Sequence, residues 1–188
     1  MALLIRNARI LTLATGARTR HGKELGELGI IPQGDVLITA DKITAVGPRI
    51  EAPVGAEIIE AQGRVLMPGF IDCHTHACWA GDRLNEWEQK LRGVPYAEIL
   101  KTGGGIHATV PAVRAATKKQ LAAHLKTRLD AMLRDGTTTV EIKSGYGLQT
   151  EEELKMLRAI VRAGNEWAGT IVPTALLGHA FEGDLDEY

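Results

Sequence analysis

Short apolar runs separated by polar turns fill the first third of the chain, a pattern typical of β-strands. The runs lie at 3–5, 8–11, 35–38, 42–47, 56–60 and 64–67. Ala40 and Asp41 separate two of the runs and predict a hairpin turn, whereas the glycine-rich stretch 16–34 predicts a loop. Residues 1–63 therefore predict a small β unit with too few strands to close a core alone.

From Pro68 onward the pattern changes to alternating helices and strands. Strands are expected where β-branched and apolar residues cluster, at 70–73, 137–142 and 170–177. Two helices are expected between and beside them, each opened by a capping box: Thr117 with Gln120, and Thr150 with Glu153. Strands separated by helices of this length indicate βαβ units and a parallel sheet.

The length limits how complete this α/β fold can be. About 120 residues follow Pro68, enough for about three strand–helix units, whereas a closed eightfold barrel needs about 250 residues. The acidic end 184–188 offers no obvious closing element. We expect either a small open sheet or part of a longer protein.

Composition excludes several classes of partner and compartment. The 188 residues carry a net charge of −1, with 45% hydrophobic and 24% charged residues, as in ordinary globular proteins. Neither nucleic acid nor a membrane is an expected partner, because there is no basic surplus and no apolar run of about 20 residues. No secretory signal is evident. The two cysteines, Cys73 and Cys78, form no disulfide framework, which favours the reducing cytoplasm.

His74 and His76 end the expected strand at 70–73. Residues two apart in a strand face the same way, so both imidazoles can point at one metal ion. Asp72 shares their parity and could orient a ligand, whereas Cys73 has the opposite parity. The alternative is that two histidines at a strand end bond loop carbonyls, although catalytic sites in barrels lie where strands end. Two histidines alone do not make a catalytic metal site, which usually has three or more protein ligands.

The remaining histidines differ in where the pattern places them. His179 follows the strand at 170–177, so it alone is expected near His74 and His76. His124 lies on the face of an expected helix, and His21 and His107 lie in expected loops. These three are expected to be structural or exposed to solvent.

Residues 68–76, Pro-Gly-Phe-Ile-Asp-Cys-His-Thr-His, resemble the signature of the metal-dependent amidohydrolase superfamily. The stretches 80–83, 103–106, 140–148 and 177–180 look like those of its imidazolonepropionase family. The resemblance implies a partial (β/α)8 TIM-like barrel, about the first three strand–helix units, over residues 64–188. It also implies that residues 1–63 are the preceding β-sandwich portion.

The resemblance further implies hydrolysis of the ring amide of 4-imidazolone-5-propanoate to N-formimino-L-glutamate. It implies one zinc or iron ion, bound by His74 and His76, and a homodimer. Arg83, Tyr146 and His179 match substrate-binding positions, and Tyr96 is a candidate of the same kind that could instead be core. A guanidinium fork suits the substrate carboxylate.

Two further features invite other interpretations. Some amidohydrolases bridge two metals with a carbamylated strand lysine, but the resemblance implies a single metal, so Lys143 is interpreted as structural or electrostatic. The glycines at 103–105 lack the strand and the Gly-Lys-Ser/Thr ending of a phosphate loop. They are interpreted as a mobile loop over the pocket.

One departure from the family pattern is large. Its third metal histidine, metal-binding aspartate and catalytic glutamate lie on later strands, so no catalytic residue is expected within these 188 positions and the chain resembles an N-terminal half. Two alternatives stay open. The chain could belong to another cyclic-amide hydrolase or deaminase, or be a non-catalytic piece for binding or assembly.

Overall fold

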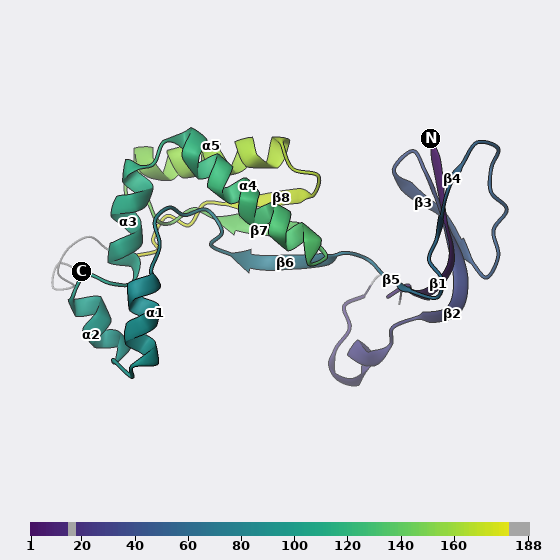
Figure 1. Cartoon of the computed structure of the whole chain (residues 1–188), viewed down its shortest axis with the longest axis horizontal. Helices are drawn as coiled ribbons and strands as arrows, with labels where there is room; N and C mark the ends of the chain where they lie inside the picture. The colour runs from purple at the N-terminus through teal and green to yellow at the C-terminus, as the bar shows by residue number, and fades with distance from the viewer. Residues whose placement is uncertain (15–17, 181–188) are drawn as a thin grey trace. The chain divides into compact units, whose positions relative to one another are not determined.

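The computed structural model describes residues 1–14 and 18–180, and its contacts divide the chain into two compact units (Figure 1). The units are Met1–Pro68 and Gly69–Tyr188. The division falls after the last strand of the first sheet, five residues beyond the expected boundary at Gly63. The acidic segment 184–188 lies outside the described residues.

The first unit is a mixed sheet of five strands over its described residues. Its order is β3 (Lys42–Gly47), β2 (Ile30–Thr39), β1 (Ala2–Leu11) and β4 (Glu57–Glu60), and β5 (Val65–Leu66) also pairs with β1. Neighbours β1, β2 and β3 are antiparallel, whereas β4 and β5 run parallel to β1. The small core of this sheet consists of Ala8, Ile10, Val36 and Ala61.

Two expectations for this unit need correction and one is confirmed. Runs 3–5 and 8–11 form one strand, whose register shifts between Ile5 and Ala8. The expected loop is wrong for 30–34, which already belong to β2, and it also contains the short 3-10 helix η1 (Gly22–Gly26). The hairpin is confirmed: Ala40 and Asp41 have φ of 48° and 65°, as a two-residue type I′ turn requires.

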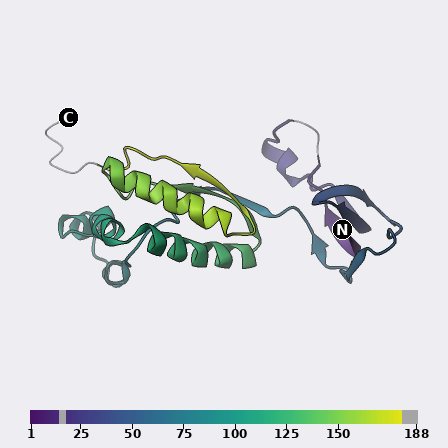
Figure 2. The ribbon, with the colours of Figure 1, turned by 90° about the horizontal axis from the view of Figure 1, so that it is seen from above.

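The second unit contains a parallel sheet in the order β6, β7, β8 (Figure 2). These strands are β6 (Phe70–Thr75), β7 (Thr137–Lys143) and β8 (Thr170–Thr174). Helices α4 (Lys118–Arg134) and α5 (Thr150–Asn165) pack together and against the sheet. Their apolar residues bury the β7 side chains that face them, and the core includes Leu121, Leu125, Leu129, Val140, Ile142, Met156 and Ile160.

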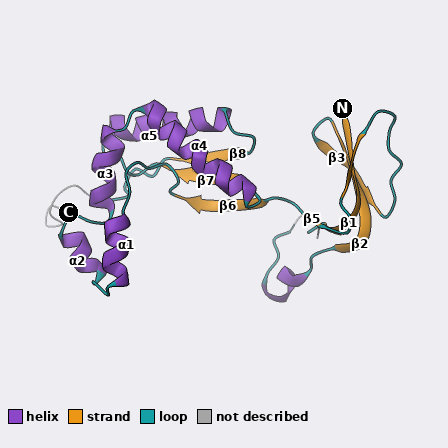
Figure 3. Ribbon diagram, viewed as in Figure 1, coloured by secondary structure: helices purple, strands orange, loops and turns teal. Residues whose placement is uncertain are grey.

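Three short helices connect β6 to α4 (Figure 3). They are α1 (Leu84–Leu91), α2 (Tyr96–Lys101) and α3 (Ile106–Ala115). Because all three strands of the sheet run in the same direction, their carboxyl ends lie at one edge. The sheet therefore brings together His74, the segment after Lys143 and the segment after Thr174.

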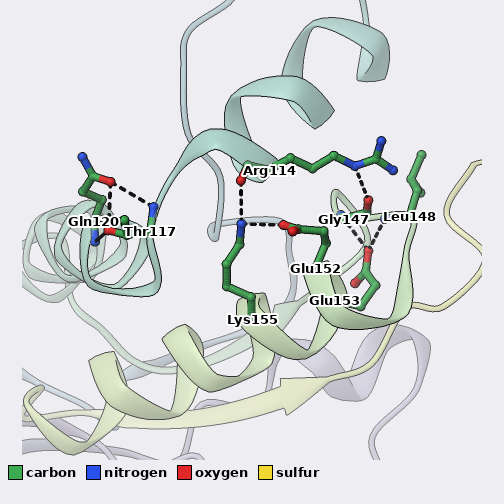
Figure 4. A network of polar contacts seen from close by, with 8 residues as sticks. All are labelled: Arg114, Thr117, Gln120, Gly147, Leu148, Glu152, Glu153 and Lys155. Atoms are coloured by element: carbon green, nitrogen blue, oxygen red, sulfur yellow. Dashed lines mark hydrogen bonds and ion pairs between the residues drawn. The ribbon is translucent and has the colours of Figure 1, made fainter.

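The two predicted capping boxes have different outcomes. The first is confirmed, because Thr117 Oγ1 accepts from the Gln120 amide at 3.2 Å and Gln120 Oε1 accepts from the Thr117 amide at 2.9 Å (Figure 4). The second is wrong. Helix α5 has Gln149 as its N-cap, and the Glu153 carboxylate bonds the preceding loop instead.

Over the described residues, no helix has the length and apolar character to cross a membrane.

Candidate functional site

His74 and His76 lie at the carboxyl end of β6 with their ring centroids 5.7 Å apart. His74 is exposed, whereas His76 is partly buried and its Nδ1 has no hydrogen-bond partner within the described part of the chain. Asp72 Oδ1 accepts from the His74 backbone amide at 3.3 Å, so it orders the strand end. The buried Nδ1 is an atom that a metal ion or a water molecule would satisfy.

Two more rings complete a cluster around His76. The His179 ring stacks on the His76 ring with centroids 4.6 Å apart and an interplanar angle of 19°. The Tyr146 ring lies 5.7 Å from that of His76 and 5.2 Å from that of His179. The structure thus brings together four of the residues expected in the site, from the ends of three strands.

A backbone carbonyl indicates which ring nitrogen of His179 carries a hydrogen. His179 Nδ1 lies 2.8 Å from Gly145 O. A carbonyl oxygen only accepts, so Nδ1 donates and carries the hydrogen. In the neutral ring, Nε2 is then an acceptor. His179 can therefore offer a lone pair to a substrate hydrogen or a cation.

His76 has a lowered pKa. Burial is the largest cause, and the positive charges of His179, Lys143 and His74 lower it further, against an opposing effect of Glu141. The neutral imidazole is therefore favoured near neutral pH, and this is the form that binds metals. No cluster of three His, Cys, Asp or Glu residues suited to a metal occurs among the described residues. The two histidines fit one part of a metal-ligand set.

A cavity of about 350 Å³ opens beside this cluster. Arg83 lines it together with His76 and Tyr146. The remaining lining residues, which sequence reasoning did not anticipate, are Trp79, Ala80, Asp82 and Thr109. Trp79, Ala80 and Asp82 follow His76 closely, so proximity to the strand end could have indicated them, but Thr109 comes from α3 and had no such signal.

Arg83 is held in place by Glu86. Its Nε and Nη2 donate to Glu86 Oε2 at 2.9 and 2.6 Å, which raises the pKa of Arg83 and lowers that of Glu86. The other oxygen of Glu86 accepts from the Gly105 amide at 2.9 Å. One buried carboxylate therefore anchors both the arginine and the glycine-rich segment that was expected to be mobile.

Tyr96 occupies a different position. It is 53% exposed at the start of α2, and the Lys90 ammonium lies 5.4 Å from its ring centroid. Within the described chain, Tyr96 is not among the residues that line the cavity beside His76. Its hydroxyl faces Gly105, on the segment that Glu86 anchors.

Lys143 and Glu141 form an ion pair on β7, with Nζ 2.5 Å from Oε2. Burial opposes the charged form of Glu141, but hydrogen bonds from Lys143, Thr174 and the Thr75 amide outweigh it and lower the pKa to about 2. Thr75 Oγ1 also donates to Glu141 O at 2.6 Å. Glu141 therefore ties β7 to β6, and its ion pair with Lys143 agrees with a structural or electrostatic role for that lysine.

The other chemically active residues lie elsewhere. His21, His107 and His124 are exposed, and His107 lies on α3 where a loop was expected. Cys73 is an exposed thiol and Cys78 a buried one, and burial raises the pKa of Cys78 to about 12. None of these five residues belongs to the ring cluster.

Relatives of this chain carry a consistent name. The chain is 45% identical to the imidazolonepropionase of Vibrio parahaemolyticus, and the match covers the whole chain and 47% of that relative. The imidazolonepropionase of Hyphomonas neptunium is 43% identical over 97% of the chain and 46% of its own length. The predicted resemblance is confirmed, and the chain spans about half the length of the curated relatives it matches.

Solved structures support the fold. A prolidase complexed with N-methylphosphonate-L-proline matches 93% of the chain and 32% of its own, with a TM-score of 0.56 and 20% identity. An atrazine chlorohydrolase mutant from Arthrobacter aurescens, complexed with zinc and atraton, matches 91% of the chain and 35% of its own, with a TM-score of 0.54 and 20% identity. These similarities indicate a fold related to the TIM barrel.

A family model matches the central part of the chain. This model, described as the amidohydrolase family, covers residues 65–163. The matched region contains the strand with His74 and His76, as well as Arg83 and Tyr146. The chain belongs to the amidohydrolase family.

Proposed function

We propose that the protein hydrolyses the ring amide of 4-imidazolone-5-propanoate to N-formimino-L-glutamate. The observation that carries the proposal is the cluster of His76, Tyr146 and His179 beside a cavity that Arg83 also lines. The volume of that cavity, about 350 Å³, lies at the lower end of the range for small-molecule sites, roughly 300–1,000 Å³. The names of the similar enzymes support the choice of substrate.

In this proposal His74 and His76 contribute two imidazole ligands to a single zinc or iron ion. Such an ion lowers the pKa of a water molecule towards neutrality and so supplies a nucleophile. The lowered pKa of His76 and its unsatisfied buried Nδ1 support this role. Zinc in the similar atrazine chlorohydrolase supports zinc as one candidate.

Arg83 binds the propanoate carboxylate. Arg83 donates hydrogen bonds to Glu86 from Nε and Nη2. Its Nη1 donates to no acceptor within the described residues, and the residue lines the cavity, so Nη1 is available to a substrate. Tyr146 and His179 supply a hydroxyl and an acceptor nitrogen for the polar atoms of the ring. Tyr96 supports the segment at Gly105 with its hydroxyl and does not contact the substrate directly.

The remaining parts of the proposal rest on the family resemblance. Residues 64–188 form about the first three strand–helix units of a (β/α)8 barrel, and residues 1–63 belong to the β-sandwich portion. The three parallel strands and their two covering helices support this arrangement. The missing metal ligands and the proton-transferring residue come from later strands. The protein works as a homodimer. It lies in the cytoplasm, a reducing compartment that suits its two free thiols.

Replacing Arg83 by alanine should raise KM for 4-imidazolone-5-propanoate by about 30- to 100-fold, since a charge-assisted contact to a carboxylate contributes about 2–3 kcal/mol. The measurement is steady-state hydrolysis by the protein at its full natural length. The effect should vanish for an analogue that lacks the propanoate carboxylate, because that analogue has nothing for the guanidinium to bind.

Arg92→Ala is the matched control. Arg92 pairs with Glu88 on the exposed end of α1, where both side chains are more than half exposed. We expect its KM to stay within about twofold of the parent, since exposed ion pairs contribute about 0–1 kcal/mol. An Arg83→Ala protein as active as the parent would show that the carboxylate assignment is wrong.

A further inference from the structure

A buried carboxylate lies under the loop that carries Tyr146. We propose that Glu153 is a positioning residue, which sets the geometry of Tyr146 and His179 by binding the backbone between β7 and α5. This inference rests on the proposed function, in which Tyr146 and His179 contact the substrate. Glu153 touches neither substrate nor metal, and acts through the backbone.

The Glu153 carboxylate accepts three hydrogen bonds from backbone amides. Its Oε2 accepts from the Gly145 amide at 2.7 Å. Its Oε1 accepts from the amides of Gly147 and Leu148 at 2.7 and 2.8 Å (Figure 4). The residue is only 5% exposed, and no ion pair with a cation is found for it among the described residues. Three charge-assisted hydrogen bonds can offset the cost of burying one carboxylate.

Two glycines allow this close approach. A Cβ on Gly147 would lie 2.6 Å from the Glu153 amide nitrogen, so any side chain there would push the loop away from α5. Gly145 has a φ of 112°, and a Cβ on it would lie 2.9 Å from His179 Nδ1. The loop is therefore built to fit between the Glu153 carboxylate and the His179 ring.

The backbone connects Glu153 to both functional side chains. Gly145 donates its N–H to Glu153 and accepts from His179 Nδ1 through its carbonyl. Tyr146 lies between the anchored Gly145 and Gly147, so its backbone is held on both sides. A shift of the loop would move the Tyr146 ring and break the contact that orients His179.

A second set of contacts holds the same loop from outside. Arg114 Nε donates to Gly147 O at 2.9 Å, and Lys155 Nζ donates to Arg114 O at 2.8 Å (Figure 4). Glu152 pairs with Lys155 rather than with the loop. Glu151, also in the first turn of α5, is exposed and has no contact with the loop among the described residues, which provides a matched control for experiment.

The simpler alternative is that Glu153 only stabilises α5, as an acidic residue in the first turn does through the helix dipole. Such a role would reduce the folded fraction and the apparent kcat without changing KM. A positioning role predicts a change in KM for the molecules that remain folded, because substrate contacts are displaced.

The test uses Glu153→Gln and Glu151→Gln in the protein at its full natural length. In Glu153→Gln the new side-chain amide would point an N–H donor at backbone N–H groups, so the loop must move. We expect KM for 4-imidazolone-5-propanoate to rise at least tenfold in Glu153→Gln and to change less than twofold in Glu151→Gln. Glu153→Asp keeps the charge with a shorter reach, and we expect its KM to rise at least threefold with kcat nearly unchanged.

Imidazole ¹⁵N NMR provides a readout independent of turnover. The His179 Nδ1–H signal should shift in Glu153→Gln and stay in place in Glu151→Gln. KM values within twofold of the parent for both Glu153 variants, together with an unmoved His179 signal, would overturn the inference. If the parent lacks hydrolytic activity, the proposed function fails, but the NMR comparison still decides whether Glu153 positions the loop.

Discussion

Replacing His76 by alanine should remove most of the bound metal and lower kcat/KM on the order of 1,000-fold or more, which corresponds to about 4 kcal/mol of transition-state stabilisation. The imidazole lies at the end of β6, has a lowered pKa and presents a buried nitrogen without a protein partner among the described residues. Metal content by mass spectrometry and hydrolysis of 4-imidazolone-5-propanoate should be measured on the same preparation.

His124→Ala is the matched control for this change. His124 is exposed on α4 and belongs to no part of the ring cluster. Its replacement should leave both the metal content and kcat/KM unchanged. An His76→Ala protein that keeps a full complement of metal and its activity would exclude His76 as a ligand.

Replacing Leu129 by alanine should lower the free energy of unfolding of the second unit by about 3 kcal/mol, within the range of roughly 2–5 kcal/mol for a buried leucine. Leu129 is 0% exposed and belongs to the cluster that joins α4, α5 and β7. The loss combines the transfer free energy of the side chain with the cavity that its removal leaves. Urea unfolding followed by circular dichroism measures it.

Leu91→Ala makes the same chemical change on a surface. Leu91 lies at the end of α1 and is 72% exposed, so its replacement should change stability by less than about 0.5 kcal/mol. Equal effects of the two replacements would mean that the cluster around Leu129 does not stabilise the unit as described.

Turn and capping rules predicted the elements in which no other contact competed for the same side chains. The hairpin at Ala40 and Asp41 follows from turn chemistry, and the helix after Thr117 follows from its capping box. The same rule failed at Thr150 and Glu153. There, the carboxylate accepts from three amides of the loop directly before α5, and these outnumber the single bond of a cap.

In the site, too, some features follow from the sequence pattern and others do not. Strand parity predicted that His74 and His76 face one side, and the position of His179 after a later strand predicted that it lies near them. The pairing of Thr75 with Glu141, 66 positions apart, depends on the register between β6 and β7. No pattern along the chain contains that register, and the same is true of Thr109 in the cavity wall.

Turnover of 4-imidazolone-5-propanoate tests the central claim most directly. The protein at its full natural length, loaded with zinc or with iron, should convert this compound to N-formimino-L-glutamate. The product can be followed by mass spectrometry, and activity should fall after chelation and return with the metal. A metal-loaded, folded protein that binds the compound without forming this product would contradict the proposed function.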